Sequence, residues 1–81
     1  MIDLIENMSE KGQVLLKYIK AYREKHHYGP TYSEMMNDLG WSTKSLVDYW
    51  IQQLERRGLI ERVPNYPRSV KLTQRALDEL P

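Results

Sequence analysis

Apolar residues recur at helical spacing in the first third of the chain. They would form one face of a helix from about residue 9 to residue 26. Ser9 is a suitable N-cap, because its hydroxyl can accept a hydrogen bond from a backbone N–H group in the first turn. Pro30 ends the segment, since proline lacks a donor and disfavours helical geometry in the residue before it. The apolar face consists of Val14, Leu15, Tyr18, Ile19 and Tyr22.

A second, shorter helix is expected directly after Pro30. Thr31 and Glu34 form a Thr-x-x-Glu capping box, in which each side chain accepts a hydrogen bond from the backbone N–H group of the other residue. Gly40 would end this helix in the left-handed conformation. The apolar residues between them are Met35, Met36 and Leu39.

A tight turn over residues 40–42 separates this helix from a third one. Either Ser42 or Thr43 would cap the third helix, which continues to about residue 57 before Gly58 ends it. Two helices joined by a short turn that contains glycine are typical of a helix-turn-helix. The apolar stripe of the third helix consists of Val47, Ile51 and Leu54.

The periodicity changes after the third helix and indicates a hairpin. Residues 59–63 are expected to form a strand, residues 64–67 a proline-rich turn and residues 68–72 the returning strand. Thr73 would then cap a last short helix over residues 74–80. Its apolar side holds Ala76, Leu77 and Leu80.

This order of elements predicts a mainly α-helical domain with a small β-hairpin. The architecture is a winged helix-turn-helix, with a three-helix core, the hairpin as the wing and a short C-terminal helix. We divide the chain into a leader over residues 1–8, the winged helix-turn-helix domain over residues 9–72 and the C-terminal helix over residues 73–81.

The third helix has a polar face opposite its apolar stripe. At roughly 100° per residue, this face points about 140–200° away from Val47. Any exposed helix has a polar face, but the tight turn before this one and the basic hairpin after it favour DNA binding. In the major groove Gln can pair with adenine, Arg can pair with guanine and Leu can contact the thymine methyl group. The candidate base-reading residues are Lys44, Ser45, Leu46, Asp48, Tyr49, Gln52 and Arg56.

The hairpin adds basic residues beside this helix. Cations there can neutralise phosphates and fix the register without reading bases. They also protect an exposed hairpin edge from aggregation, and both roles can hold at once. The first turn of the second helix offers backbone amide groups that can bind a phosphate. The candidate phosphate-contacting residues are Thr31, Ser33, Arg62, Asn65, Tyr66, Arg68 and Lys71.

The formal net charge of +1 hides an uneven distribution. Residues 44–75 hold seven of the twelve Lys and Arg residues but only three of the eleven acidic residues. A basic surplus concentrated in one segment is typical of a surface that binds nucleic acid.

The composition excludes several classes of protein. The 81 residues contain no cysteine, which excludes a disulfide framework and a thiolate metal site. The adjacent His26 and His27 would point apart on a helix, so they predict no metal site. No apolar run approaches the roughly 18 residues of a membrane-spanning helix, and early acids replace the basic start of a signal peptide. We expect a soluble, intracellular protein that is not an enzyme and uses no cofactor.

These motifs together resemble the N-terminal winged-helix DNA-binding domain of the SOS repressor LexA. The resemblance covers residues 9–72 and rests on the Pro-Thr-x-x-Glu box at residues 30–34, the Leu-Gly-aromatic turn at residues 39–41 and the Arg-Gly-Leu-Ile-Glu sequence at residues 57–61. It implies that bases are read at Thr43, Ser45, Leu46, Asp48 and Tyr49. The family has Asn, Ala, Glu and Glu at the last four of these positions, so the resemblance does not imply that the SOS operator is the site.

The resemblance does not extend to the family's self-cleaving, dimerising C-terminal domain with its Ser/Lys dyad. We predict sequence-specific binding of double-stranded DNA and transcriptional regulation as a repressor, in the cytoplasm at a bacterial nucleoid, by a bacterial or phage-encoded protein. Although the last helix could instead pack on the first one within a single chain, two copies are expected to pair weakly on DNA through apolar residues near the termini. These residues are Ile2, Leu4, Ile5, Leu77 and Leu80.

The alternative is a winged-helix adaptor that binds a protein partner and does not bind DNA. The folded surface discriminates between the two. One connected positive face over Arg56, Arg62, Arg68 and Lys71 would support DNA binding, whereas a mixed surface with an apolar patch would support the adaptor.

Overall fold

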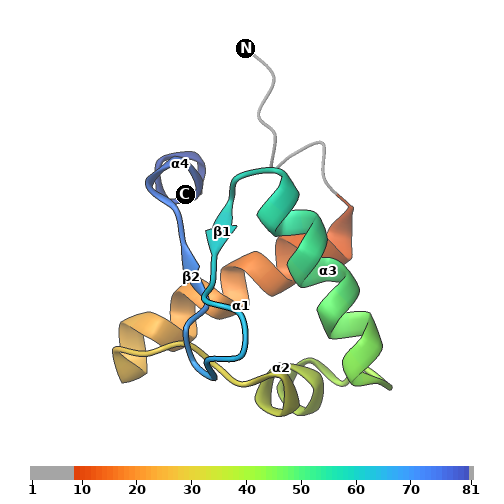
Figure 1. Ribbon diagram of the computed structural model, residues 1–81. Coiled ribbons are helices and arrows are strands. Elements are labelled where there is room, and N and C mark those ends of the chain that lie inside the picture. Colours follow the sequence, from red (N-terminus) through yellow and green to blue (C-terminus); the bar gives the residue numbers. More distant parts are fainter. Residues whose placement is uncertain (1–8, 81) are drawn as a thin grey trace.

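The computed structural model describes residues 9–80, which form helices around a small two-stranded antiparallel sheet (Figure 1). The residues expected to form a leader, and with them Ile2, Leu4 and Ile5, lie outside the described part. The predicted winged helix-turn-helix is confirmed. The elements are α1 (Glu10–His26), α2 (Tyr32–Leu39), α3 (Lys44–Arg56), β1 (Ile60–Glu61), β2 (Lys71–Leu72) and α4 (Gln74–Glu79).

Each helix begins at a side-chain cap that the sequence predicted. Ser9 accepts a hydrogen bond from the backbone of Gly12 at 3.5 Å, and Thr73 does the same for Ala76 at 3.2 Å. Of the two candidates before α3, Thr43 is the cap and accepts from the Leu46 amide at 3.1 Å. Such bonds satisfy backbone donors that the first turn of a helix leaves without partners.

The capping box at the start of α2 is complete. Glu34 accepts a hydrogen bond from the Thr31 backbone at 2.8 Å, and the Thr31 hydroxyl accepts one from the Glu34 backbone at 3.1 Å. At the other end, Gly40 adopts the left-handed conformation with φ of 69°. A Cβ atom there would meet no atom within 4 Å, so the backbone conformation and not crowding favours glycine.

The hairpin ladder is much shorter than the sequence suggested. The strands predicted over residues 59–63 and 68–72 are wrong in length, since only Ile60–Glu61 and Lys71–Leu72 pair, with Ile60 opposite Leu72. Asn65 and Arg68 have φ of 67° and 65°, which is incompatible with an extended strand. Beyond the ladder, the Ser69 hydroxyl accepts from the Val63 N–H group and donates to the Val63 carbonyl, at 3.0 and 3.1 Å.

All helices and both strands contribute to one apolar core. Two predictions are corrected here: Val14 is 40% exposed and Leu77 is 42% exposed, whereas Leu16, which the predicted face of α1 omitted, is fully buried. Trp41 and Trp50 pack against this core from its edge. The buried apolar side chains are Leu15, Leu16, Ile19, Met35, Val47, Ile51, Leu54, Leu59, Ile60, Val70, Leu72, Ala76 and Leu80.

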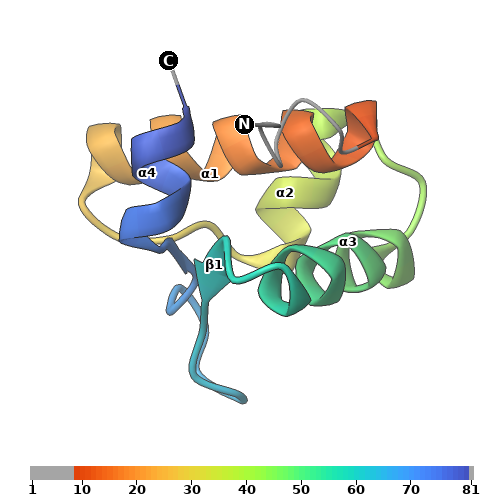
Figure 2. The same cartoon turned by 90° about the horizontal axis from the view of Figure 1, so that it is seen from above.

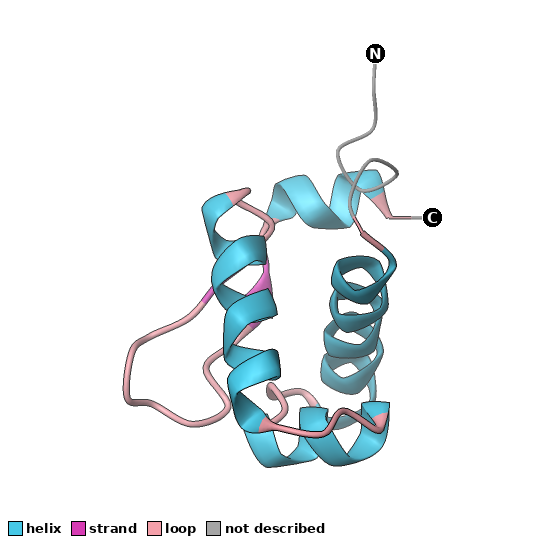
Figure 3. Ribbon diagram, turned by 90° about the vertical axis from the view of Figure 1, so that its right-hand side faces the viewer, coloured by secondary structure: helices cyan, strands magenta, loops and turns pink. Residues whose placement is uncertain are grey.

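The hairpin is attached to the helices by a close backbone contact. The Gly29 N–H group donates to the Arg68 carbonyl at 3.2 Å, and a Cβ atom on Gly29 would lie 2.5 Å from the Val70 carbonyl oxygen. The loop between β1 and β2 then extends away from the helical body, as Figures 2 and 3 show. It projects from the side of the molecule on which α3 lies (Figure 2).

Candidate nucleic-acid interface

The outward face of α3 is the first component of the candidate interface. Its apolar stripe is fully buried, so the opposite side of the helix points to solvent. Tyr49 is 53% exposed, although it is large and aromatic, and its ring packs edge-on against Trp50. Leu46 and Asp48 are half-buried at the margin of this face. The exposed candidates are Thr43, Lys44, Ser45, Tyr49, Gln52 and Arg56.

Asp48 differs from these residues because its carboxylate already has partners. One oxygen accepts a hydrogen bond from the Tyr32 hydroxyl at 3.1 Å, and the other accepts one from Gln52 Nε2 at 2.6 Å. This carboxylate at the margin of the polar face is therefore hydrogen-bonded within the protein and is not free to turn toward a base, although it keeps its negative charge.

Arg62 in the hairpin is also engaged inside the fold. Its Nη1 atom donates to the Tyr32 hydroxyl at 3.1 Å. Its Nε atom lies 3.5 Å from a carboxylate oxygen of Glu55, which is close enough for attraction, although that buried N–H group makes no hydrogen bond. Tyr32 at the start of α2 thus joins the hairpin to α3.

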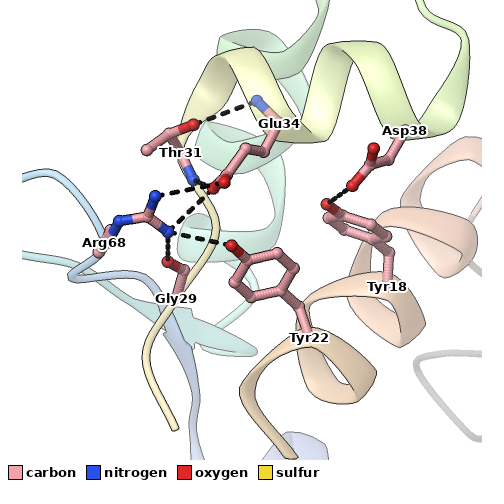
Figure 4. Close-up of polar contacts among 7 residues, drawn as sticks. All are labelled: Tyr18, Tyr22, Gly29, Thr31, Glu34, Asp38 and Arg68. Carbon is pink, nitrogen blue, oxygen red and sulfur yellow. Dashed lines mark hydrogen bonds and ion pairs between the residues drawn. The ribbon is translucent and has the colours of Figure 1, made fainter. Parts of the chain in front are cut away.

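Arg68 occupies the centre of a second cluster, which Figure 4 shows. Its guanidinium group forms a two-pronged ion pair with Glu34, at 3.0 and 3.2 Å. Nη1 also donates to the Tyr22 hydroxyl at 3.0 Å and to the Gly29 carbonyl at 3.3 Å. The guanidinium lies 4.6 Å from the centre of the Tyr28 ring, within the range of a cation–π interaction.

The groups of this cluster stabilise one another's charged forms. The Thr31 N–H group, followed by the Arg68 guanidinium, lowers the pKa of Glu34 from its ordinary value of 4.5 to about 2. Hydrogen bonds with Tyr22 and Glu34 raise the pKa of Arg68. Glu34 is therefore charged at neutral pH and serves both the capping box of α2 and the hairpin.

These contacts bear on the connected positive face over Arg56, Arg62, Arg68 and Lys71 that would favour DNA binding over the adaptor. Arg62 and Arg68 are each turned toward an acidic partner, which weakens such a face. Arg56 on α3 and Lys71 on β2 are exposed. The basic residues between positions 44 and 75 are thus of two kinds: some hold the hairpin against the helices, and others face solvent.

A cleft of about 390 Å³ separates the hairpin loop from the helices. Thr31 and Tyr32 line it from the start of α2, and Asp48 lines it from α3. Arg62, Asn65, Tyr66 and Arg68 line it from the hairpin side. The cleft brings together most of the candidate phosphate-contacting residues, whereas Ser33 and Lys71 lie outside its lining.

Sequence reasoning missed the tyrosines that organise both clusters. Tyr32 was treated only as part of the capping box, and Tyr22 only as an apolar residue of α1. Their partners are 16 to 46 residues away in the chain. No local spacing could have indicated these contacts, because they exist only after the hairpin packs beside α2.

Within residues 9–80, no helix is long and apolar enough to cross a lipid bilayer. The same residues contain no group of three or more His, Asp or Glu side chains that could hold a metal ion.

The fold and the exposed α3 face define a winged helix-turn-helix domain of the DNA-binding class. The sequence profile of the LexA DNA-binding domain matches residues 5–69. The chain belongs to the LexA DNA-binding domain family, whose matched domain is the non-catalytic, DNA-binding part of transcriptional repressors.

Similar proteins agree with this assignment. The LexA repressor of Ligilactobacillus salivarius is 40% identical over 90% of the chain, and that of Acetivibrio thermocellus is 32% identical over 80% of it. The LexA repressor of Carboxydothermus hydrogenoformans is 31% identical over 90% of the chain. The chain spans only 30–37% of the length of these relatives.

Proposed function

We propose that this domain binds double-stranded DNA sequence-specifically and represses transcription, with α3 in the major groove. The observation that carries the proposal is the exposed polar face of α3, at the margin of which the Asp48 carboxylate is hydrogen-bonded by Tyr32 and Gln52. The exposed polar groups of such a face can hydrogen-bond base edges in the major groove.

The candidate residues divide into three roles. Ser45, Tyr49, Gln52 and Arg56 face the bases, together with Leu46 at the margin, and Thr43 and Lys44 meet the groove at the first turn of α3. The candidates that contact the DNA backbone are Thr31, Ser33, Arg62, Asn65, Tyr66 and Lys71. Arg68 positions the hairpin, because its donors are directed to Glu34, Tyr22 and Gly29.

Selection of binding sites from random duplexes tests the proposal. Wild-type protein should enrich one short motif and bind it more tightly than a scrambled duplex. Tyr49→Ala and Gln52→Ala should each reduce that discrimination by about fivefold or more, since one good base contact contributes about 1–3 kcal/mol. Lys17→Ala on the exposed side of α1 is the matched surface control and should leave the discrimination unchanged.

The protein-interaction adaptor is the second candidate, and one observation favours it. Val63 and Tyr66 in the hairpin loop are 54% and 70% exposed, and the two neighbouring arginines are paired within the fold. Such an uncharged loop also suits a protein partner. Absence of any binding to duplex DNA at low salt would support the adaptor and contradict the proposal.

Assembly, location and cofactor use complete the proposal. The domain acts without a cofactor or catalysis, in the cytoplasm of a bacterium or as a phage-encoded protein. Two copies pair weakly on a palindromic site, since one winged helix reads only a short half-site. Leu77 can contribute to the contact, whereas Leu80 is only 9% exposed and belongs to the core. Sedimentation of the selected complexes should give two copies on a palindrome and one copy in free solution.

A further inference from the structure

The Asp48 carboxylate lies at the margin of the outward α3 face and is directed at neighbouring residues. A carboxylate can only accept hydrogen bonds, and both of its oxygens do so here, from Tyr32 and from Gln52. At 2.6 Å, the bond from Gln52 Nε2 is short for an amide donor. Asp48 is thus occupied before any base arrives.

Asp48 is itself held in place by two other elements. Arg62 in the hairpin donates to the Tyr32 hydroxyl, so the hydroxyl proton is left for Asp48. Burial raises the pKa of Tyr32 to about 12, which keeps this proton on the hydroxyl at neutral pH. The chain of contacts runs from the hairpin through α2 to Asp48, and from Asp48 to Gln52.

The contact with Asp48 fixes which way the Gln52 amide group points. A glutamine in solvent can turn its amide by 180° and exchange the positions of its oxygen and nitrogen. Because Asp48 accepts only, the Gln52 nitrogen must face it. The Oε1 atom then lies on the other side of the amide group, on an exposed residue of the outward face.

We propose that Asp48 is a positioning residue that orients Gln52 so that its Oε1 selects a base carrying an exocyclic amino group. This inference rests on the proposed function, because it requires α3 to lie in the major groove. There the amino groups are adenine N6 and cytosine N4, while guanine O6 and thymine O4 are acceptors that would repel Oε1. The second N–H group of Gln52 can also reach adenine N7, so adenine is the preferred base.

The effect belongs to a single position of the DNA site. Wild-type protein should prefer adenine or cytosine over guanine or thymine there by about tenfold, the size of one good base contact. The position is identified as the one at which Gln52→Ala loses all preference.

The test combines Asp48→Asn with Gln52→Ala in a double-mutant cycle. An asparagine both donates and accepts, so it no longer forces the Gln52 nitrogen inward. Asp48→Asn should reduce the tenfold preference to less than about threefold at this position and leave other positions unchanged. In the Gln52→Ala background it should produce no further change in base preference, because Asp48 acts through Gln52.

Glu61→Gln is the charge-matched control. Glu61 is an exposed carboxylate on β1, and its removal takes away the same negative charge without touching Gln52. It should strengthen binding to all duplexes alike. If Asp48→Asn only reproduced this uniform effect, or if it changed base preference in the Gln52→Ala background, the positioning role would be wrong. A selected guanine or thymine at this position would also overturn it.

A measurement without DNA separates this inference from the proposed function. In NMR spectra of the free protein, one Gln52 side-chain N–H proton should be protected from exchange at least tenfold more than those of Gln53, the neighbouring half-buried glutamine of α3. Asp48→Asn should abolish the protection. Unprotected Gln52 protons in a protein that does bind DNA would refute the positioning role alone. A protected proton in a protein that binds no duplex would refute the proposed function, and base selection with it.

Discussion

At the scale of single residues, Arg68, a candidate phosphate contact, also joins the hairpin to the helices. Its backbone has φ of 65°, a conformation that costs a non-glycine residue free energy and persists only where its surroundings impose it. The surroundings here are Glu34, Tyr22, Gly29 and the Tyr28 ring. The same carboxylate completes the capping box of α2, so Glu34 stabilises two elements at once.

The low pKa of Glu34 predicts a pH-dependent contribution to stability. Because this pKa is about 2 in the folded protein and 4.5 without its partners, the stabilisation is complete above pH 4.5 and is lost as the pH falls toward 2. Glu34→Gln should therefore lower the melting temperature at pH 7. The difference in melting temperature between this variant and wild type should shrink as the pH is lowered from 4.5 to 2. Thermal melts over this range measure the effect, with Glu61→Gln as the control for loss of one carboxylate. A difference that stayed constant with pH would contradict the role of the ionised group.

At the scale of elements, the hairpin depends on its base more than on its ladder. Only two residue pairs form the sheet, and an isolated hairpin of this size is not stable in water. Gly29 allows the loop before α2 to approach the Val70 carbonyl, and Thr73 donates to the Gly58 carbonyl at 2.7 Å on the other side. These two attachments, together with the contacts of Arg62 and Arg68, therefore set the orientation of the hairpin relative to α3.

Two glycine substitutions should destabilise the protein for different reasons. Gly29→Ala places a Cβ atom 2.5 Å from backbone and should cost about 1–3 kcal/mol as an overpacked site. Gly40→Ala meets no neighbour but forces alanine to a φ of 69°, at about 1–2 kcal/mol. Asparagine tolerates this conformation and should recover stability at position 40 but not at position 29. Urea unfolding of the four variants measures this, and equal recovery at both positions would contradict it.

At the scale of the whole molecule, the formal net charge of +1 gives little information about where DNA would bind. Arg62 and Arg68 lie near Glu55 and Glu34, so their charges are compensated within the fold. Lys44, Arg56 and Lys71 are exposed. Affinity for the DNA backbone should therefore come from fewer cations than the sequence contains in this segment.

The salt dependence of DNA binding distinguishes the two kinds of basic residue. Lys71→Ala should reduce the slope of log affinity against log salt by about 0.9, the value for one phosphate contact, and leave the melting temperature unchanged. Arg68→Ala should lower the melting temperature and weaken all duplexes through the misplaced hairpin. Titrations at several salt concentrations and thermal melts of both variants measure this. If Arg68→Ala instead reduced the salt slope by about 0.9 and left the melting temperature unchanged, the predicted contact between Arg68 and a phosphate would be supported.

The sequence by itself determined the helices and their order, because the signals that specify them are local. Ser9, Thr31, Thr43 and Thr73 each cap a backbone group three residues away, and Gly40 ends α2 through its own conformation. The spacing of apolar residues then identified the buried stripe of α3 and, by exclusion, its polar face. The class of fold and the candidate DNA-reading helix followed from these features.

Only the tertiary structure decided what the polar residues on that framework do. Arg68 meets Glu34 across 34 residues and Arg62 meets Tyr32 across 30 residues, so neither pair has a signature in local spacing. The same holds for Asp48, whose partner Tyr32 belongs to the preceding helix. These hydrogen bonds within the protein form only once the hairpin, α2 and α3 have packed together, because only then do donor and acceptor come within hydrogen-bonding distance.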